Sequence, residues 1–227
     1  IAQMIEDRAV SNQFLGLFRR FKTVRQDAIL DVPVPFMVRA ALMNNNLKAS
    51  ILHIARTAAD AEIRAIAYTI TANLANTNVQ LVDPADPANQ LEARAYGAYD
   101  PETDTVLLPN TGDITIQTLL HEAGHAVTAA YIENNPNSAE VNALKALFST
   151  AYTQVMPHLS SVAYREGGVT PTPEEVTLTE VKELVAEIKS NMEMRNTLRR
   201  LALDDLRVPQ KGVLLNALEW VNSIFRK

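Results

Sequence analysis

The sequence predicts a mainly α-helical protein with a small β-sheet beside one central helix, an α+β fold. Apolar residues recur at helical spacing through most of the chain. Only three short runs, 79–82, 93–99 and 105–108, have the composition of strands. The segment from about 114 to 132 reads as a helix that is apolar over much of its surface, which indicates a buried and central position.

The composition excludes several classes of protein. The chain has 227 residues, 47% of them hydrophobic and 21% charged, as is usual for a globular protein. A net charge of -5 without a long basic run argues against nucleic acid as a partner, and no apolar run is long enough for a membrane span. Because Cys is absent, a metal ion would need His, Asp or Glu ligands. The first residue is Ile1 rather than Met, so we expect a piece of a larger polypeptide or assembly.

Residues 1–78 are expected to form an N-terminal helical region, followed by a second unit at 79–227. Periodicity predicts helices at about 1–30, up to Met43, at 47–57 and at 61–74, with Asp60 as the N-cap of the last. The region has no chemical motif, and its lone His53 is interpreted as structural. Its apolar stripes need cover, so we expect it to pack on the second unit.

The three strand-like runs predict a strand at 79–82 and a hairpin whose turn is formed by residues 100–104. Pro109 limits the second arm of the hairpin, as proline does on an edge strand. An exposed edge just before the central helix could pair with an extended peptide substrate. The alternative is a hairpin that only covers the core, and the sequence does not separate the two.

The segment 118–128 contains the pattern H-E-x-x-H, formed by His121, Glu122 and His125. Residues four apart share one face of a helix, so both imidazoles can bind one tetrahedral Zn²⁺ and leave a position open for water. Glu122 is offset around the helix, where it can accept a proton from that water and pass it to a leaving amine. Gly124 costs about 1 kcal/mol relative to Ala, which close packing would explain, although a tolerated glycine is also possible. The apolar stripe of this helix comprises Ile116, Leu119, Leu120, Ala123, Val127 and Ala130.

A later helix supplies further candidate ligands. Thr177 and Glu180 form a capping box that opens it, and Glu183 and Glu187 then repeat on one face. Like charges at this spacing are mildly unfavourable, and a cation between them and the central helix would remove that cost. The alternative is a solvated acidic face. The core stripe comprises Val181, Leu184, Val185, Ile188 and Met192, and terminal helices are expected at 194–203 and 209–225, the latter with Trp220.

The run His-Glu-Ala-Gly-His-Ala-Val at 121–127, followed by Lys-Glu-Leu-Val-Ala-Glu at 182–187, resembles the gluzincin metallopeptidases. It is most similar to the branch that contains anthrax lethal factor and zincin domains of large phage proteins. The resemblance covers about residues 93–192 and implies a zincin-like catalytic domain that needs Zn²⁺. It leaves a virion-associated and a bacterial cytoplasmic location both open.

The resemblance also implies roles for individual residues. It gives His121, His125 and Glu183 as zinc ligands, Glu122 as the general base and Glu187 as an acid that orients a ligand. A second assignment makes Glu187 the ligand and Asn191 the orienting residue, because 187–191 resembles the E-x-x-S-D run of other gluzincins. The family's oxyanion-stabilising tyrosine would correspond to Tyr164, which a Gly/Pro-rich segment separates from the glutamate helix.

We therefore expect a zinc-dependent metallopeptidase that hydrolyses a peptide or protein substrate, with Glu122 as general base. Two alternatives remain open at the level of sequence. One is a degenerate zincin that serves as a structural or binding module of a larger, phage-type protein. The other is metal-dependent hydrolysis of a non-peptide amide.

Overall fold

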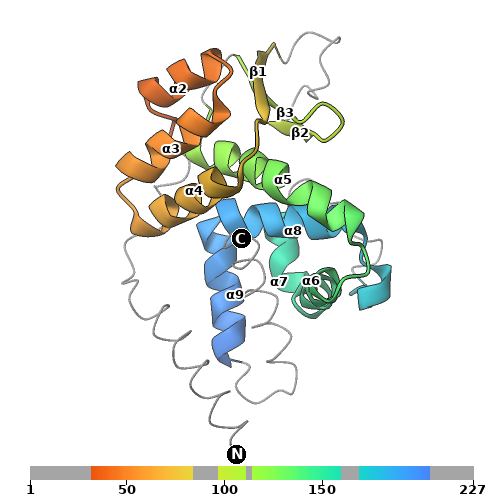
Figure 1. Cartoon of the computed structure of the whole chain (residues 1–227). Coiled ribbons are helices and arrows are strands. Elements are labelled where there is room, and N and C mark those ends of the chain that lie inside the picture. Colours follow the sequence, from red (N-terminus) through yellow and green to blue (C-terminus); the bar gives the residue numbers. More distant parts are fainter. Residues whose placement is uncertain (1–31, 84–96, 111–113, 160–168, 205–227) are drawn as a thin grey trace, which may run out of the picture.

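The computed structural model of the chain describes residues 32–83, 97–110, 114–159 and 169–204 (Figure 1). Within these segments the protein is mainly helical with one small sheet, so the predicted fold class is confirmed. The predicted helices at 1–30 and 209–225, with Trp220, lie outside the described residues, as does Tyr164. Within the same segments, no helix combines the length and the apolar composition needed to cross a membrane.

Three helices open the described chain: α2 (Phe36–Met43), α3 (Leu47–Thr57) and α4 (Ala61–Asn73). Their boundaries follow local capping. The Asn46 side chain accepts a hydrogen bond from the Ala49 amide at 2.9 Å and so starts α3. Asp60 caps α4, as predicted, by accepting from two amide groups at 2.7 and 2.9 Å.

The sheet contains β1 (Asn78–Val82), β2 (Ala98–Asp100) and β3 (Thr105–Pro109) in the order β1-β3-β2. The predicted hairpin is present, because β2 pairs antiparallel with β3. Of the two interpretations that the sequence left open, an exposed edge at the strand directly before the central helix is not the one found. β3 is the middle strand because β1 pairs with it in parallel, and Pro109 lies at the strand end, where the Asn110 amide bonds Val82 instead, at 2.7 Å. Among the described residues, the edge strands of the sheet are β1 and β2.

The central helix α5 (Ile116–Asn134) runs between two hydrophobic clusters. Its first half packs with α2–α4 and the sheet in the first cluster, whereas Ile132 near its end belongs to the second. Figure 1 shows α5 crossing the molecule diagonally, beneath the sheet and above α8. The buried face therefore changes along the helix. This change explains why Ala130, which was predicted to belong to the apolar stripe, is exposed.

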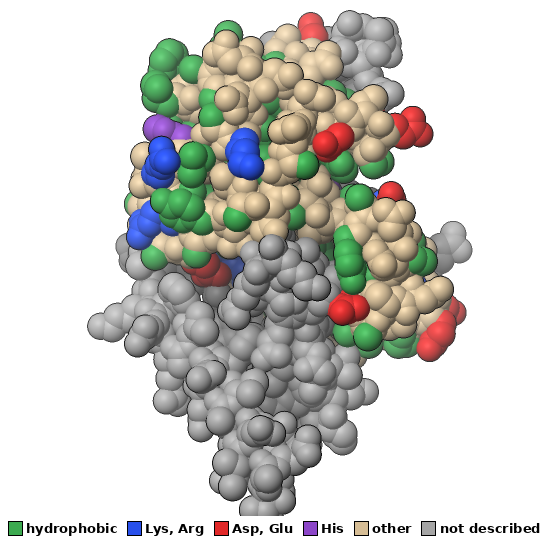
Figure 2. All heavy atoms as spheres, in the orientation of Figure 1, with side chains coloured by type: hydrophobic (Ala, Val, Ile, Leu, Met, Phe, Trp, Pro, Cys, Tyr) green, Lys and Arg blue, Asp and Glu red, His purple; other side chains and the backbone are tan. Residues whose placement is uncertain are grey.

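The second cluster is built by the helices below α5. They are α6 (Ala139–Thr150), α7 (Tyr152–Val155), α8 (Leu178–Ser190) and α9 (Met192–Asp204), with 3₁₀ turns at Met156–His158 and Pro173–Glu175. The predicted capping box opens α8, because the Glu180 amide bonds Thr177 Oγ1 at 3.2 Å and the Thr177 amide bonds the Glu180 carboxylate at 2.7 Å. The predicted core stripe of α8 is buried throughout. On the face seen in Figure 2, Lys and Arg side chains gather at the left, over α2–α4. Several Asp and Glu side chains lie at the right of the same face.

The first cluster crosses the predicted boundary between residues 78 and 79. It joins Ile51, Ile54 and Ile63 from α3 and α4 with Leu108 of β3 and Leu119 of α5. Each of these side chains is at most 1% exposed. The described part of the helical region therefore covers apolar surface of the sheet and of α5.

A chain that begins at Thr77 should be less stable and less soluble than the full chain. It would expose Leu108, Leu119 and neighbouring side chains, each worth about 1.5–3 kcal/mol when buried. Thermal unfolding and sedimentation of the two chains measure the effect. Equal unfolding midpoints and equal solubility would contradict it.

Candidate metal centre

The close packing of α5 on α8 creates the site. Gly124 of α5 is buried, and a Cβ atom built on it would lie 3.6 Å from Ala186 Cα and 3.9 Å from Ala186 Cβ. These are ordinary contact distances, so two small residues allow the helices to approach without requiring glycine. The same approach brings the α5 histidines opposite the α8 glutamates.

Three side chains point their donor atoms at one another. Nε2 of His121 and Nε2 of His125 are 3.1 Å apart. The Glu183 carboxylate completes the triangle, with Oε2 at 3.5 Å from His121 Nε2 and Oε1 at 3.3 Å from His125 Nε2. One ligand atom from each of the three residues lies within 4.8 Å of the others.

The dimensions of this triangle fit a tetrahedral metal ion. Ligand atoms at about 2.0–2.1 Å from a tetrahedral Zn²⁺ lie about 3.3–3.4 Å from one another. The two Nε2 atoms lie 3.1 Å apart, and each lies 3.3 or 3.5 Å from one of the two Glu183 oxygens, which is close to that value for a carboxylate that can offer either oxygen. Two imidazoles and one carboxylate are also a donor set that zinc uses in catalytic sites, where the fourth position stays open. The residues present could therefore hold a divalent ion.

Glu187 lies behind His121 rather than inside the triangle. Its Oε1 is 3.5 Å from His121 Nδ1, the ring nitrogen on the opposite side from the Nε2 atoms. Ser190 Oγ approaches the same Nδ1 at 3.4 Å. A carboxylate at Nδ1 fixes the tautomer that leaves Nε2 free to bind a metal. Glu187 Oε2 is buried, and the Asn191 side chain acts on the same carboxyl group, where it lowers the pKa of Glu187 against the rise that burial causes.

The electrostatics of the cluster favour a bound cation. Burial lowers the pKa of His121, but the carboxylates of Glu183, Glu122 and Glu187 outweigh it and raise this pKa to about 9. Burial raises the pKa of Glu122, and the two imidazoles offset part of that rise. Burial likewise raises the pKa of Glu187, and the charge of His121 is the largest effect that opposes this rise. Without an ion, a proton on His121 supplies the positive charge that the carboxylates need, so metal and proton compete for this ring.

Glu122 faces a different neighbour. It is 7% exposed, and its carboxylate lies against the start of β2. A Cβ atom built on Gly97 would be only 2.8 Å from Glu122 Cγ and 3.0 Å from its Oε1. Gly97 thus leaves the space that the Glu122 side chain occupies. The Glu122 side chain therefore lies beside the three candidate ligands and next to the edge strand β2.

The structure brings together five of the residues singled out from the sequence: His121, Glu122, His125, Glu183 and Glu187. Asn191, the orienting residue of the second assignment, lies directly after α8, where its side chain acts on Glu187 and accepts from the Met194 amide. Tyr164 lies outside the described residues. Sequence reasoning gave no role to Gly97 or Ser190. Ser190 follows Glu183 and Glu187 at helical spacing, which could have placed it on the same face of α8.

The chain matches no known family model, and no curated protein or solved structure is detectably similar to it. The assignment of the site therefore depends on its own geometry and chemistry.

Zinc affinity should distinguish the two candidate glutamates. Because Glu183 faces both Nε2 atoms and Glu187 faces only His121 Nδ1, Glu183→Ala should remove nearly all bound zinc. Glu187→Ala should weaken binding only about 10–100-fold. Competition with a chelator measures both affinities, and Glu193→Ala, which changes an exposed carboxylate on α9, is the control. Affinities in the reverse order would make Glu187 the ligand.

Proposed function

We propose that the protein is a zinc-dependent metallopeptidase of the gluzincin type. The observation that carries this proposal is the triangle of His121 Nε2, His125 Nε2 and the Glu183 carboxylate, with Glu122 adjacent on the same helix. Its spacing suits a tetrahedral ion, and its donor set suits zinc. Glu122 lies beside the triangle with its carboxylate against Gly97, and it is not one of the three candidate ligands, so it remains available as a base.

A zinc ion held at this triangle would supply Lewis acidity for the carbonyl and for water. The remaining chemistry belongs to the protein. Glu122 accepts a proton during attack on the carbonyl and donates it to the leaving amine. Its burial, which raises its pKa, suits a group that must both take and return a proton. Glu187 holds the His121 ring in the orientation that ligation needs.

The edge strand β2 favours a peptide as the substrate. Among the described residues, β2 pairs on one side only, with β3. Its first residues follow directly on Gly97, which contacts Glu122. An extended peptide that paired with the outer edge of β2 would pass next to this carboxylate. This arrangement supports peptide-bond hydrolysis over hydrolysis of a small amide, which has no need of a strand edge.

Glu122→Gln should retain about one Zn²⁺ per chain and the unfolding midpoint of the wild type, but lose about 10²–10⁴-fold or more in hydrolysis of a peptide library. Glutamine has nearly the same shape and cannot take up the proton. The His121→Ala/His125→Ala double variant should lose both zinc and activity. A wild-type chain that binds zinc but cleaves no peptide would favour a binding module, and zinc that survives in the double variant would contradict the proposed site.

Gly97→Ala should lower hydrolysis while zinc content stays unchanged. The new methyl group would displace the Glu122 carboxylate but would touch none of the three proposed ligands. The matched control is Gly124→Ala, whose methyl group makes ordinary contacts with Ala186 and should stabilise α5 by up to about 1 kcal/mol. Steady-state kinetics and metal analysis of both variants test this. Full activity in Gly97→Ala would show that Glu122 tolerates displacement and is not a precisely placed base.

A further inference from the structure

The end of α8 is held by a buried arginine from the next helix. Arg195 of α9 is 8% exposed. Its Nη1 donates hydrogen bonds to the carbonyl oxygens of Ile188 and Lys189 at 3.1 and 3.0 Å. Carbonyl groups in the last turn of a helix have no partner within the helix, and a cation there also complements the helix dipole. Arg195 therefore caps α8, the helix that carries Glu183 and Glu187.

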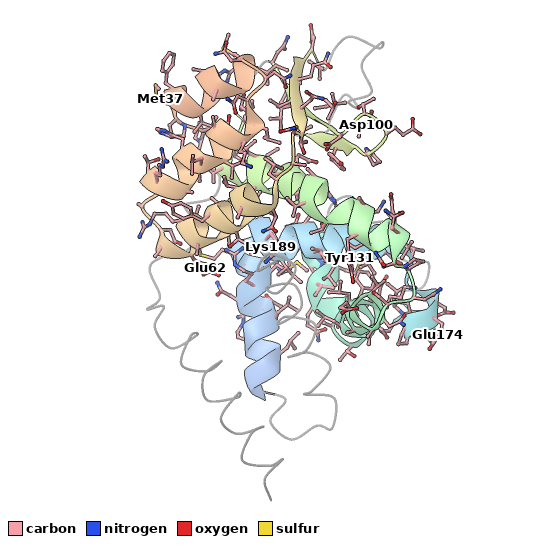
Figure 3. All side chains as sticks on the ribbon, in the orientation of Figure 1. Met37, Glu62, Asp100, Tyr131, Glu174 and Lys189 are labelled. Carbon is pink, nitrogen blue, oxygen red and sulfur yellow. The ribbon has the colours of Figure 1, made fainter. Side chains whose placement is uncertain are left out.

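The same guanidinium reaches the helical region at the start of the chain. Its Nε lies 2.8 Å from Glu62 Oε1, and both side chains are largely buried, at 9% and 16% exposure. Glu62 belongs to the first turn of α4. Figure 3 shows Glu62 at that end of α4 and Lys189 near the corner where α8 meets α9. Loss of this carboxylate would remove a counter-charge that lies 2.8 Å from a buried arginine, which is unfavourable.

A second contact joins the same elements. Met192, the first residue of α9, is 5% exposed and belongs to the first hydrophobic cluster, with α3, α4 and the sheet. Met194 and Leu198, further along α9, belong to the second cluster. The corner between α8 and α9 is thus fixed from the α4 side by an apolar contact and an ion pair.

We infer that Arg195 and Glu62 are positioning residues for the metal centre, through which the N-terminal helical region fixes the last turn of α8. This turn contains Glu187 and Ser190, which both approach His121 Nδ1. If the turn frays, the His121 ring loses its orientation and the site loses affinity for the ion. Residues 32–74 then help to hold the ligands of the metal centre in position and are not a separate module. The inference rests on the metal site proposed above.

Arg195→Met and Glu62→Gln test the link, and Arg64→Met is the matched control. Arg64 also donates from Nη1 to two backbone carbonyls, those of Ala58 and Ala59 at 2.6 and 2.8 Å, but it does so at the start of α4. Glu62→Gln keeps the size of the side chain and so guards against loss of the fold in Arg195→Met. Two quantities are measured in the full chain: amide hydrogen exchange of residues 188–191 in the metal-free protein, and the zinc dissociation constant by chelator competition.

Exchange in the last turn of α8 should rise about 10–100-fold in Arg195→Met and Glu62→Gln, the factor expected when the hydrogen bonds from Arg195 Nη1 to the Ile188 and Lys189 carbonyls are lost or released, and it should not rise in Arg64→Met. Zinc affinity should fall about tenfold in the same two variants, and the double variant should be no worse than Arg195→Met alone, because both changes break one linkage.

Unchanged exchange at 188–191 would overturn the inference, as would faster exchange with an unaltered zinc dissociation constant. Failure of the proposed function has a different signature. A wild-type chain that binds zinc without cleaving peptides would refute the peptidase, while the exchange and affinity data still decide whether α4 positions the site. A wild-type chain that binds no zinc would refute both the metal centre and the positioning role.

Discussion

The close approach of α5 to α8 is the constraint on which the site depends. Gly124 and Ala186 meet at the contact, where an added Cβ on the glycine would lie 3.6 Å from the backbone of the alanine. A long or branched side chain at either position would push the helices apart. The separations of 3.1 to 3.5 Å between the imidazole nitrogens and the Glu183 carboxylate would then be lost. Small residues here serve the geometry of the ligands more than the stability of either helix.

That approach also concentrates charge, which must be balanced. Glu122, Glu183 and Glu187 lie beside two imidazoles in a largely buried space. Burying a carboxylate without a counter-charge is costly, so the cluster needs a cation. In the metal-free protein the His121 proton fills this need, since the surrounding carboxylates raise the pKa of His121 to about 9 against the opposing effect of burial. A divalent ion at the same place would satisfy all three acids more fully and displace that proton.

Local sequence signals predicted most of the described helices and the grouping of the candidate ligands, because caps and periodicity act over a few residues. The bounds of α3 and the capping box at Thr177 are as predicted, and so is the grouping of His121, His125 and Glu183. The errors and omissions involve distant partners. The parallel pairing of β1 with β3, which puts β3 in the middle of the sheet, has no local signature. The contact of Gly97 with Glu122 and the Glu62–Arg195 ion pair likewise join segments far apart in the chain.

One helix can both hold an ion and present a base because successive residues turn by about 100° around its axis. His121 and His125, four residues apart, face α8 together, while Glu122 turns toward β2. The small residues that line α5 on its two sides can be understood from this division. Toward α8 the small pair Gly124 and Ala186 lets the ligands converge, and toward β2 the missing side chain of Gly97 makes room for the base. A larger residue on the first side would impair the proposed metal binding, and one on the second side would impair the proposed proton transfer, so the two roles proposed for α5 can be damaged independently.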